Sequence, residues 1–211
     1  MSDRYEYTPA LWLVRHGEST WNVLGLVQGH ADEATLTSQG LCQAALVAAQ
    51  LKDRLVDAVY ASDLRRAQQT ANIVADAFDL PVQIRAELRE RSFGVCEGGP
   101  QNSLAARVTG LRGGRVVDPR AHPAGGESLQ DVYDRAGVFV DWLHEQHHRR
   151  DVIVVAHGGT IRAIRAYWDG QSMQDLVWDD VTNGSVWRLS MPEPVLTNHF
   201  SPTHVESGGI R

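Results

Sequence analysis

The stretch ALWLVRHGESTWN (10–22) joins a short apolar run to a group of charged and polar residues. The run LWLV (11–14) has the length and branching of a buried strand. Arg15 and His16 follow it directly, and Gly17 comes next. A charged pair at the end of a buried strand has three explanations that this stretch leaves open: a binding site, a catalytic site, or a polar turn where the chain leaves the sheet.

The rest of the chain alternates similar strands with amphipathic helices. Further apolar runs are AVYA (58–61), VIVVA (152–156) and the shorter, peripheral PVQI (81–84). Apolar residues at helical spacing predict helices over residues 38–54, 63–78, 127–148 and 160–168. The buried face of the first helix is expected to consist of Leu41, Ala45, Ala48 and Leu55. This alternation predicts an α/β fold, a three-layer αβα sandwich with a mostly parallel central sheet.

The 211 residues are expected to form one domain (1–211) without an internal repeat. The late segments GSVWRLSM (184–191) and PVLTNHF (194–200) are predicted to form a pair of strands. The Gly- and Arg-rich segment 98–126 is a variable insertion, and insertions of this length are typical of functional lids or of disordered segments. The polar tail, from about 201 to 211, is predicted to be mobile.

Composition limits the classes of partner. The net charge of -6 at pH 7 argues against nucleic acid or an anionic membrane as the main partner. No segment approaches the roughly 18 to 20 continuous apolar residues that span a bilayer, and the polar N-terminal stretch is not a secretory signal. Cys42 and Cys96 form no CxxC pair and are interpreted as free thiols. These features predict a cytoplasmic protein that binds neither nucleic acid nor membrane.

Arginines or histidines follow each of the three main strands at its carboxyl end, and glycines stand beside them after the first and third. Arg15 and His16 follow the first strand, Arg65 and Arg66 the second, and His157 the third. In open α/β sheets, ligands bind beyond this edge. Arginine forks match phosphate oxygens, helix N-termini attract anions, and a neutral imidazole is a nucleophile. The pattern therefore predicts a pocket for a tetrahedral dianion, in which a histidine attacks phosphorus.

Simpler explanations exist for each residue alone. A single histidine at a strand end is more often structural, and a single arginine on a helix is more often a solvated charge. Three separate strand ends that carry the same chemistry favour a site. Neither a metal nor a cofactor is predicted, because the sequence contains no HxH, no HExxH and no Cys/His cluster.

Five stretches together resemble the histidine phosphatase superfamily, in the branch that contains the cofactor-dependent phosphoglycerate mutases. They are LVRHGESTWN (13–22), YASDLRRAQQTA (60–71), LRERSFGVCEG (88–98), AGGESLQDVYDR (124–135) and VVAHGGTIRAI (154–164). The likeness extends from about Leu11 to Phe200. It implies the phosphoglycerate mutase-like version of the αβα sandwich.

The resemblance also implies a role for each motif residue. His16 would be the phosphorylated nucleophile, and Arg15 and Arg66 would clamp the phosphoryl oxygens. His157 would complete the pocket and stabilise the charge of the transition state. Glu90 would be the general acid that protonates the leaving oxygen. The residues implied on the substrate side of the pocket are Asn22, Gln28, Gly29 and Gly158.

Other polar residues near the motifs are assigned supporting places. Glu18 and Ser62 are expected to orient the arginines and the nucleophilic histidine. Glu97 is a second candidate for the acid, but its position in CEG matches the family's turn residue. His30 and His122 are expected on surface loops.

The resemblance favours phosphatases over mutases. Ser92 in ERSFG (90–94) stands where mutases have histidine, the insertion 98–126 lacks their proline run, and TNGSV (182–186) resembles the phosphatase members. The implied enzyme is a metal-independent phosphomonoesterase with a small phosphorylated substrate, such as a phosphosugar or a phosphoglycerate derivative. Alternatives are a phosphoglycerate mutase, a phosphoprotein phosphatase and a non-catalytic phospholigand-binding module.

Two further features carry hypotheses. The insertion contains four arginines, namely Arg107, Arg112, Arg115 and Arg120. They form either a basic lid that selects substrates with a second anionic group, or an exposed, solvated loop. Three late tryptophans pack either into the core or into a homodimer interface, and these are Trp168, Trp178 and Trp187.

Overall fold

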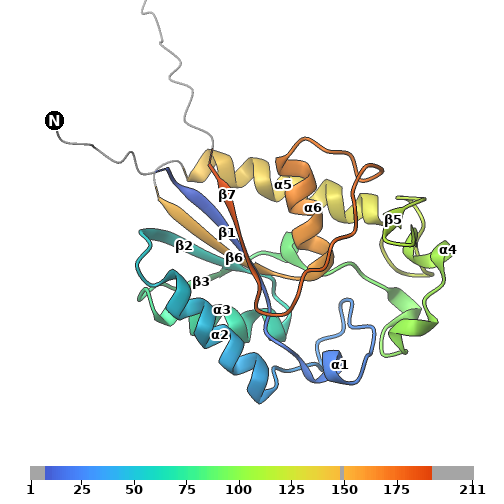
Figure 1. Cartoon of the computed structure of the whole chain (residues 1–211), viewed down its shortest axis with the longest axis horizontal. Coiled ribbons are helices and arrows are strands. Elements are labelled where there is room, and N and C mark those ends of the chain that lie inside the picture. The colour runs from blue at the N-terminus through green and yellow to red at the C-terminus, as the bar shows by residue number, and fades with distance from the viewer. Residues whose placement is uncertain (1–7, 148–149, 192–211) are drawn as a thin grey trace, which may run out of the picture.

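A five-stranded sheet forms the centre of the computed structural model, which describes residues 8–147 and 150–191. Its order is β3-β2-β6-β1-β7 (Figure 1). The strands are β1 (Ala10–Arg15), β2 (Val56–Ala61), β3 (Val82–Ile84), β6 (Asp151–Ala156) and β7 (Val186–Ser190). β7 pairs antiparallel with β1, and the other pairs are parallel. The mostly parallel sheet predicted from the apolar runs is confirmed.

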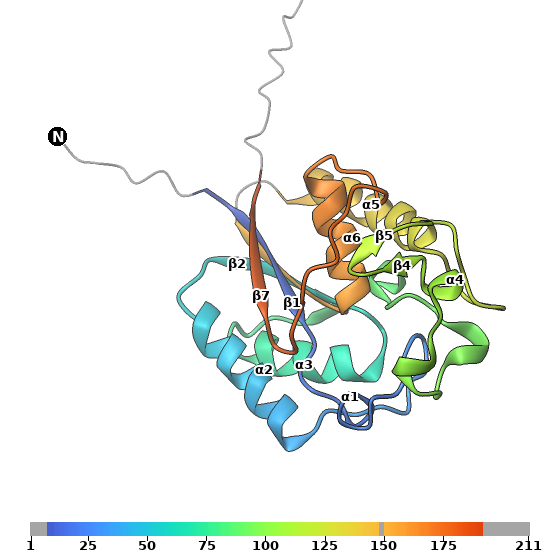
Figure 2. The ribbon, with the colours of Figure 1, turned by 45° about the vertical axis from the view of Figure 1, so that its right-hand side comes forward.

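Helices cover both faces of this sheet. They are α2 (Ser38–Leu51), α3 (Arg65–Asp76), α5 (Leu129–Gln146) and α6 (Gly158–Trp168), while the single-turn α1 (Thr20–Val23) lies apart from both layers. α2 and α3 lie on one face, and α5 and α6 lie on the other (Figures 1 and 2). Successive side chains of β1 enter opposite layers: Leu11 and Leu13 join the cluster under α5 and α6, while Trp12 and Val14 join the cluster under α2 and α3. The predicted three-layer sandwich is confirmed.

The predicted buried face of α2 was right at Ala48 and wrong at the other three residues. Leu41 is 45% exposed, Ala45 is exposed, and Leu55 lies beyond the end of the helix and is 58% exposed. The residues that α2 buries are Gly40, Ala44, Val47, Ala48 and Leu51. Close backbone packing sets this rotation, since a Cβ atom on Gly40 would lie 2.1 Å from the carbonyl oxygen of Glu18. Because this alanine-rich helix is apolar on several sides, spacing alone does not identify the buried face.

The insertion is a folded segment beside the sheet, on the right in Figure 1. It contains α4 (Ala106–Thr109) and a two-stranded hairpin of β4 (Leu111–Arg112) and β5 (Arg115–Val116). Gly113 and Gly114 form the hairpin turn with φ of 56° and 72°, the left-handed region that a two-residue type I′ turn requires. Single-turn 3₁₀ helices cover Ala86–Leu88, Gly94–Cys96 and Gln101–Ser103.

Of the two predicted late strands, the first is β7. The second, at 194–200, and the tail 201–211 lie outside the described residues. No helix within the described ranges has the length and apolar character that crossing a membrane requires.

Candidate active site

The carboxyl ends of β1 and β6 lie side by side, because Arg15 pairs in parallel register with Ala156. His16 and His157 follow these strands, and the centroids of their rings are 5.0 Å apart. Arg66 lies in the first turn of α3, which follows β2. A cavity of about 370 Å³ opens at this edge of the sheet. The predicted site residues that line it are Arg15, His16, Asn22, Gln28, Arg66 and Glu90.

The His16 ring is held in one tautomer. Its Nδ1 lies 2.7 Å from the carbonyl oxygen of Gly17. A carbonyl oxygen only accepts hydrogen bonds, so the ring proton sits on Nδ1 and a lone pair remains on Nε2. Burial, followed by the charges of Arg66 and Arg15, holds the pKa of His16 well below its ordinary value of 6.5. The geometry therefore presents a neutral imidazole with a free nitrogen, as a nucleophile requires.

His157 is fully buried and is not among the residues that line the cavity. Neither of its ring nitrogens has a hydrogen-bond partner within the described structure. Burial, the charge of Arg66 and the neighbouring His16 hold the pKa of His157 well below its ordinary value. His157 is thus a neutral ring that packs against the His16 ring at the cavity.

The two clamp arginines are oriented by backbone carbonyl oxygens. Arg66 donates from Nη2 to Gly29 at 2.8 Å and from Nη1 to Ala31 at 2.9 Å. Arg15 donates from Nη1 to the carbonyl oxygen of Val181. The Nε atoms of both arginines are buried and unpaired among the described residues. Burial lowers the pKa of Arg66 to about 10, which leaves the guanidinium charged at neutral pH.

Gly29 acts through its backbone and does not line the cavity. Its carbonyl oxygen accepts the bond from Arg66, its φ is 49°, and an added Cβ would lie 2.1 Å from Oε1 of Glu97. Glycine is therefore the residue that this turn accommodates. Gly158 lies beside two guanidinium groups. A Cβ added to Gly158 would lie 3.9 Å from Nε of Arg15 and 3.1 Å from Nη1 of Arg162.

Glu90 is held at the start of α6. Its Oε1 accepts from the Arg91 N–H at 2.8 Å, and its Oε2 accepts from the Gly159 N–H at 3.1 Å. A Cβ on Gly159 would lie 2.4 Å from Oε1, so the close approach of the carboxyl group depends on this glycine. Glu90 lines the cavity together with His16, which places a carboxyl group and the proposed nucleophile in one site.

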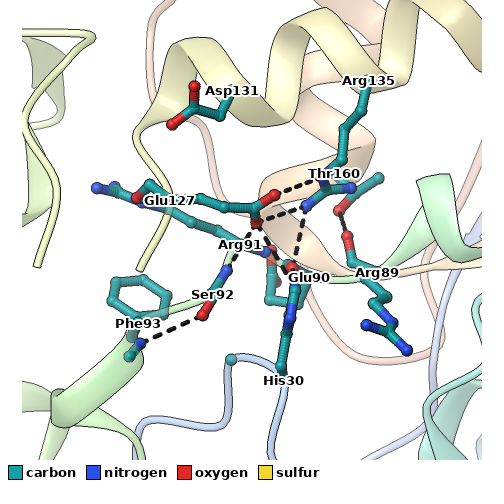
Figure 3. A network of polar contacts seen from close by, with 12 residues as sticks. His30, Arg89, Glu90, Arg91, Ser92, Phe93, Glu127, Asp131, Arg135 and Thr160 are labelled. Atoms are coloured by element: carbon teal, nitrogen blue, oxygen red, sulfur yellow. Dashed lines mark hydrogen bonds and ion pairs between the residues drawn. The ribbon is translucent and has the colours of Figure 1, made fainter. Parts of the chain in front are cut away.

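The backbone that carries Glu90 is held by a polar network that the sequence did not indicate (Figure 3). Arg135 donates from Nη2 to the Glu90 carbonyl oxygen at 3.0 Å and from Nε to Glu127 Oε1 at 3.0 Å. Nε2 of His30 lies 2.8 Å from the same Glu90 carbonyl oxygen and 3.6 Å from Glu127 Oε2. His30 is therefore part of this network, contrary to the expectation of a surface loop, whereas His122 is exposed as predicted.

Glu127 is the ionised centre of this network. Burial by itself would raise its pKa, but the His30 ring 3.6 Å away, the hydrogen bonds and charge of Arg135, and the Ser92 N–H outweigh burial and lower the pKa of Glu127 to about 2. The carboxylate receives the Ser92 N–H at 2.8 Å. Glu127 thus ties the start of α5 to the loop that carries Glu90.

Arg91 fastens the insertion to the same loop. It is 3% exposed and donates to four carbonyl oxygens. These belong to Val108, Thr109, Ala121 and Glu127, at 2.7 to 2.8 Å. Arg91 therefore has a structural role, because most of its N–H groups are bound to backbone oxygens and few remain for a ligand.

Glu18 and Ser62 act differently from their assigned supporting places, whereas Glu97 is a turn residue as expected. Glu18 was expected to orient the site arginines, but its carboxylate accepts from Thr37 Oγ1 at 2.7 Å at the start of α2. Ser62 Oγ accepts only from the Leu64 N–H, at 3.3 Å, within the described structure. Glu97 Oε1 accepts from the N–H groups of His30 and Phe93, so it braces a turn and does not line the cavity.

Asn22 and Gln28 present amide donors to the cavity. Oδ1 of Asn22 accepts from the Ser19 N–H at 3.0 Å and from Nδ2 of Asn183 at 3.2 Å. Oε1 of Gln28 accepts from Ser19 Oγ at 2.9 Å. Neither NH₂ group has a hydrogen-bond partner among the described residues, and both side chains line the cavity. In that part of the chain, no three His, Cys, Asp or Glu side chains lie close enough together to hold a metal ion.

The cavity continues into a lobe of about 180 Å³ that the sequence did not indicate. Its walls include Phe93, Leu111, Arg162 and Trp178. The insertion arginines Arg112, Arg115 and Arg120 are exposed and line neither part, and the side chain of Arg107 lies outside the part that the structure describes. The insertion instead faces the cavity with Gln101, Leu104, Thr109 and Leu111. The expected basic lid is not found in the described arginines.

The three late tryptophans are all partly buried against the core cluster beside α5 and α6. This packing supports the core alternative for Trp168 and Trp187. Trp178 also lines both parts of the cavity. The homodimer stays a prediction.

The chain is similar to known phosphatases in both sequence and structure. The model of the histidine phosphatase superfamily (branch 1) matches residues 11–195. A metal-independent phosphoserine phosphatase from Arabidopsis thaliana is 37% identical over 159 residues, which make up 72% of this chain and 65% of the plant protein. A mycobacterial glucosyl-3-phosphoglycerate phosphatase, solved with VO3, superposes with a TM-score of 0.76 and 32% identity over 86% of this chain and 92% of that one. A mutant phosphoserine phosphatase from Entamoeba histolytica, solved with phosphoserine, gives a TM-score of 0.73 and 26% identity over 85% and 89%.

Proposed function

The chain belongs to branch 1 of the histidine phosphatase superfamily, and from this premise we propose that it hydrolyses small phosphomonoesters through a phosphohistidine on His16. The observation that carries the proposal is the tautomer of His16. Its proton is bound toward the Gly17 carbonyl oxygen, and its other nitrogen is free in a cavity lined by Arg15 and Arg66. Two guanidinium groups next to a neutral nucleophile match a phosphoryl dianion.

Two displacements at phosphorus complete the proposed reaction. In the first, Nε2 of His16 attacks phosphorus, the bond from phosphorus to the ester oxygen breaks, and Glu90 gives its proton to the departing alcohol. In the second, water attacks the phosphohistidine, Glu90 takes a proton from that water, and the N–P bond breaks to release phosphate. Arg15, Arg66 and the neutral His157 would stabilise the charge on the phosphoryl oxygens in both steps.

The relatives suggest the substrate class. One is a phosphoserine phosphatase and another a glucosyl-3-phosphoglycerate phosphatase, so a small phosphorylated metabolite is the proposed substrate. The proposed enzyme needs no metal, as its protein side chains provide the nucleophile, the acid and the positive charge.

Phosphate release from a panel of phosphomonoesters, measured in EDTA, tests the proposal. We expect activity in EDTA, its loss in His16→Ala, and its retention in His122→Ala, which changes an exposed histidine. Labelled substrate should leave phosphate on the chain that is stable in alkali and lost in acid. Strict dependence on a divalent ion, or full activity of His16→Ala, would contradict the proposal. Interconversion of phosphoglycerates faster than phosphate release would identify a mutase, and ester binding without turnover a binding module.

A further inference from the structure

Arg162 is a buried arginine with unused donors at the second lobe of the cavity. It is 8% exposed, lies on α6 and lines that lobe. Its Nε and Nη2 donate to the Asp179 carbonyl oxygen at 3.0 and 2.5 Å. Both N–H groups of Nη1 are unpaired among the described residues, and Nη1 lies 3.1 Å from the position that a Cβ on Gly158 would occupy. A buried charged group that keeps free donors next to a cavity is a candidate binding group.

Two other arginines near the site, the buried Arg91 and the partly buried Arg135, provide the comparison. Arg91 uses its guanidinium on four carbonyl oxygens, and Arg135 uses its own on Glu127 and on two carbonyl oxygens. Arg162, like Arg15, is held from one side by a single backbone carbonyl oxygen of the segment before β7. Arg162 therefore resembles a phosphate-clamp arginine more closely than it resembles a structural one.

The surroundings hold the Arg162 guanidinium in place. The Trp178 ring centroid lies 4.3 Å from its Cζ, which is a cation–π contact, and Asp179 Oδ1 lies 3.5 Å from its Nε. Asp179 also pairs with Arg165 at 2.6 Å, so it neutralises the charge of Arg162 only in part. A ligand group at Nη1 thus meets two N–H donors in a fixed position. Asp179 has neutralised part of the positive charge of the guanidinium that carries them.

We propose that Arg162 is a specificity-determining residue that binds a carboxylate on the alcohol part of the substrate, next to the phosphoryl group held by Arg15. The proposal rests on the hydrolase function proposed above. A carboxylate fits better than a second phosphate, because a monoanion matches the partly neutralised guanidinium, and Glu90 lines the same lobe. A neutral hydroxyl would leave the charge of this buried group uncompensated, which is unfavourable.

Two matched substrates test the proposal. 3-Phosphoglycerate and glycerol 3-phosphate differ in carrying a carboxylate or a hydroxymethyl group at the end away from phosphate. We expect wild-type kcat/KM to be at least tenfold higher for 3-phosphoglycerate, and Arg162→Met to lower this ratio at least tenfold, mainly through KM. Arg162→Lys keeps the positive charge but lacks the paired N–H donors of the guanidinium group. Its kcat/KM ratio should therefore lie between those of the wild type and Arg162→Met. Arg188→Met, which changes an exposed arginine of β7 that lines neither part of the cavity, should leave the ratio unchanged.

Several outcomes would overturn the proposal. They are a wild-type ratio near one, an equal loss for both substrates in Arg162→Met, or an equal drop of the ratio in Arg188→Met. Should Arg162→Met fail to fold, Arg162→Lys decides, because an unchanged ratio in that variant would also count against the proposal. Hydrolysis of p-nitrophenyl phosphate with no hydrolysis of 3-phosphoglycerate would reject the carboxylate and leave the hydrolase function standing. No hydrolysis of any phosphomonoester would reject the hydrolase function itself.

Discussion

Replacing Glu127 with glutamine should make the protein less stable at neutral pH and less sensitive to acid. The Glu127 carboxylate accepts from Arg135 at 3.0 and 3.1 Å and from the Ser92 N–H at 2.8 Å, and its side chain is 24% exposed. Its pKa falls from an ordinary 4.5 to about 2. At about 1.4 kcal/mol per pKa unit, this difference corresponds to about 3 kcal/mol of folding free energy.

The sign follows from proton linkage. The pKa of Glu127 is lower in the folded chain than in the unfolded chain, so the stabilisation is complete above about pH 5 and is lost as the pH falls toward 2. The free energy of unfolding of Glu127→Gln should therefore be about 3 kcal/mol below that of the wild type at pH 7. By pH 3 the difference should shrink to about 1 kcal/mol.

Urea unfolding of both proteins, followed by circular dichroism from pH 7 to pH 3, measures this difference. Glu145→Gln, which changes an exposed glutamate of α5, is the matched control and should follow the wild type at every pH. A gap between wild type and Glu127→Gln that stays constant from pH 7 to pH 3 would refute the assigned role of the charge. A gap below about 1 kcal/mol at pH 7 would refute the magnitude.

Three other predictions concern the site. Because the pKa of His16 is held well below 6.5, phosphoenzyme formation from p-nitrophenyl phosphate should keep more than half its maximal rate at pH 6.5, and an acid limb centred higher would contradict this. Gly159→Ala puts a Cβ 2.4 Å from Glu90 Oε1 and should displace the proposed general acid. The kcat for alkyl phosphates should then fall roughly 100-fold, and the kcat for p-nitrophenyl phosphate much less, because its leaving group needs little protonation. Equal losses for both substrates would count against the acid role of Glu90. Arg91→Met leaves four carbonyl oxygens without donors and should lower the free energy of unfolding, measured in urea, by about 3 kcal/mol. Arg112→Met, which changes an exposed arginine, should leave the free energy of unfolding unchanged.

Much of the site could be predicted before the structure, since parallel strands share an edge. Arg15 ends β1, His16 and His157 directly follow β1 and β6, and their convergence needs only the strand order and direction. Strand order could not predict the position of Glu90, because this residue follows a single-turn 3₁₀ helix and no periodic pattern places it at the site. Its assignment came only from the resemblance to a family.

The residues that the sequence missed act through partners that are remote along the chain. Arg135 belongs to the polar face of a helix, where an arginine ordinarily indicates solvent, yet it holds the Glu90 carbonyl oxygen from a distance of 45 residues. His30 reaches the same oxygen across 60 residues. Such contacts leave no local signal, so the polar network of Figure 3 is visible only in the folded chain.

The alternation of strands and helices, and with it the edge of the sheet where His16 and Arg66 meet, could be predicted from consecutive residues alone. Local spacing decides these features, because apolar periodicity and strand ends are written in consecutive residues. Which face of α2 is buried, and which arginines keep free donors, depends on long-range packing and became known from the folded chain. Arg91 and Arg162 are alike in sequence terms, but the first is surrounded by four carbonyl oxygens and the second by one. Whether a buried cation is structural or available to a substrate depends on acceptors that folding brings to it.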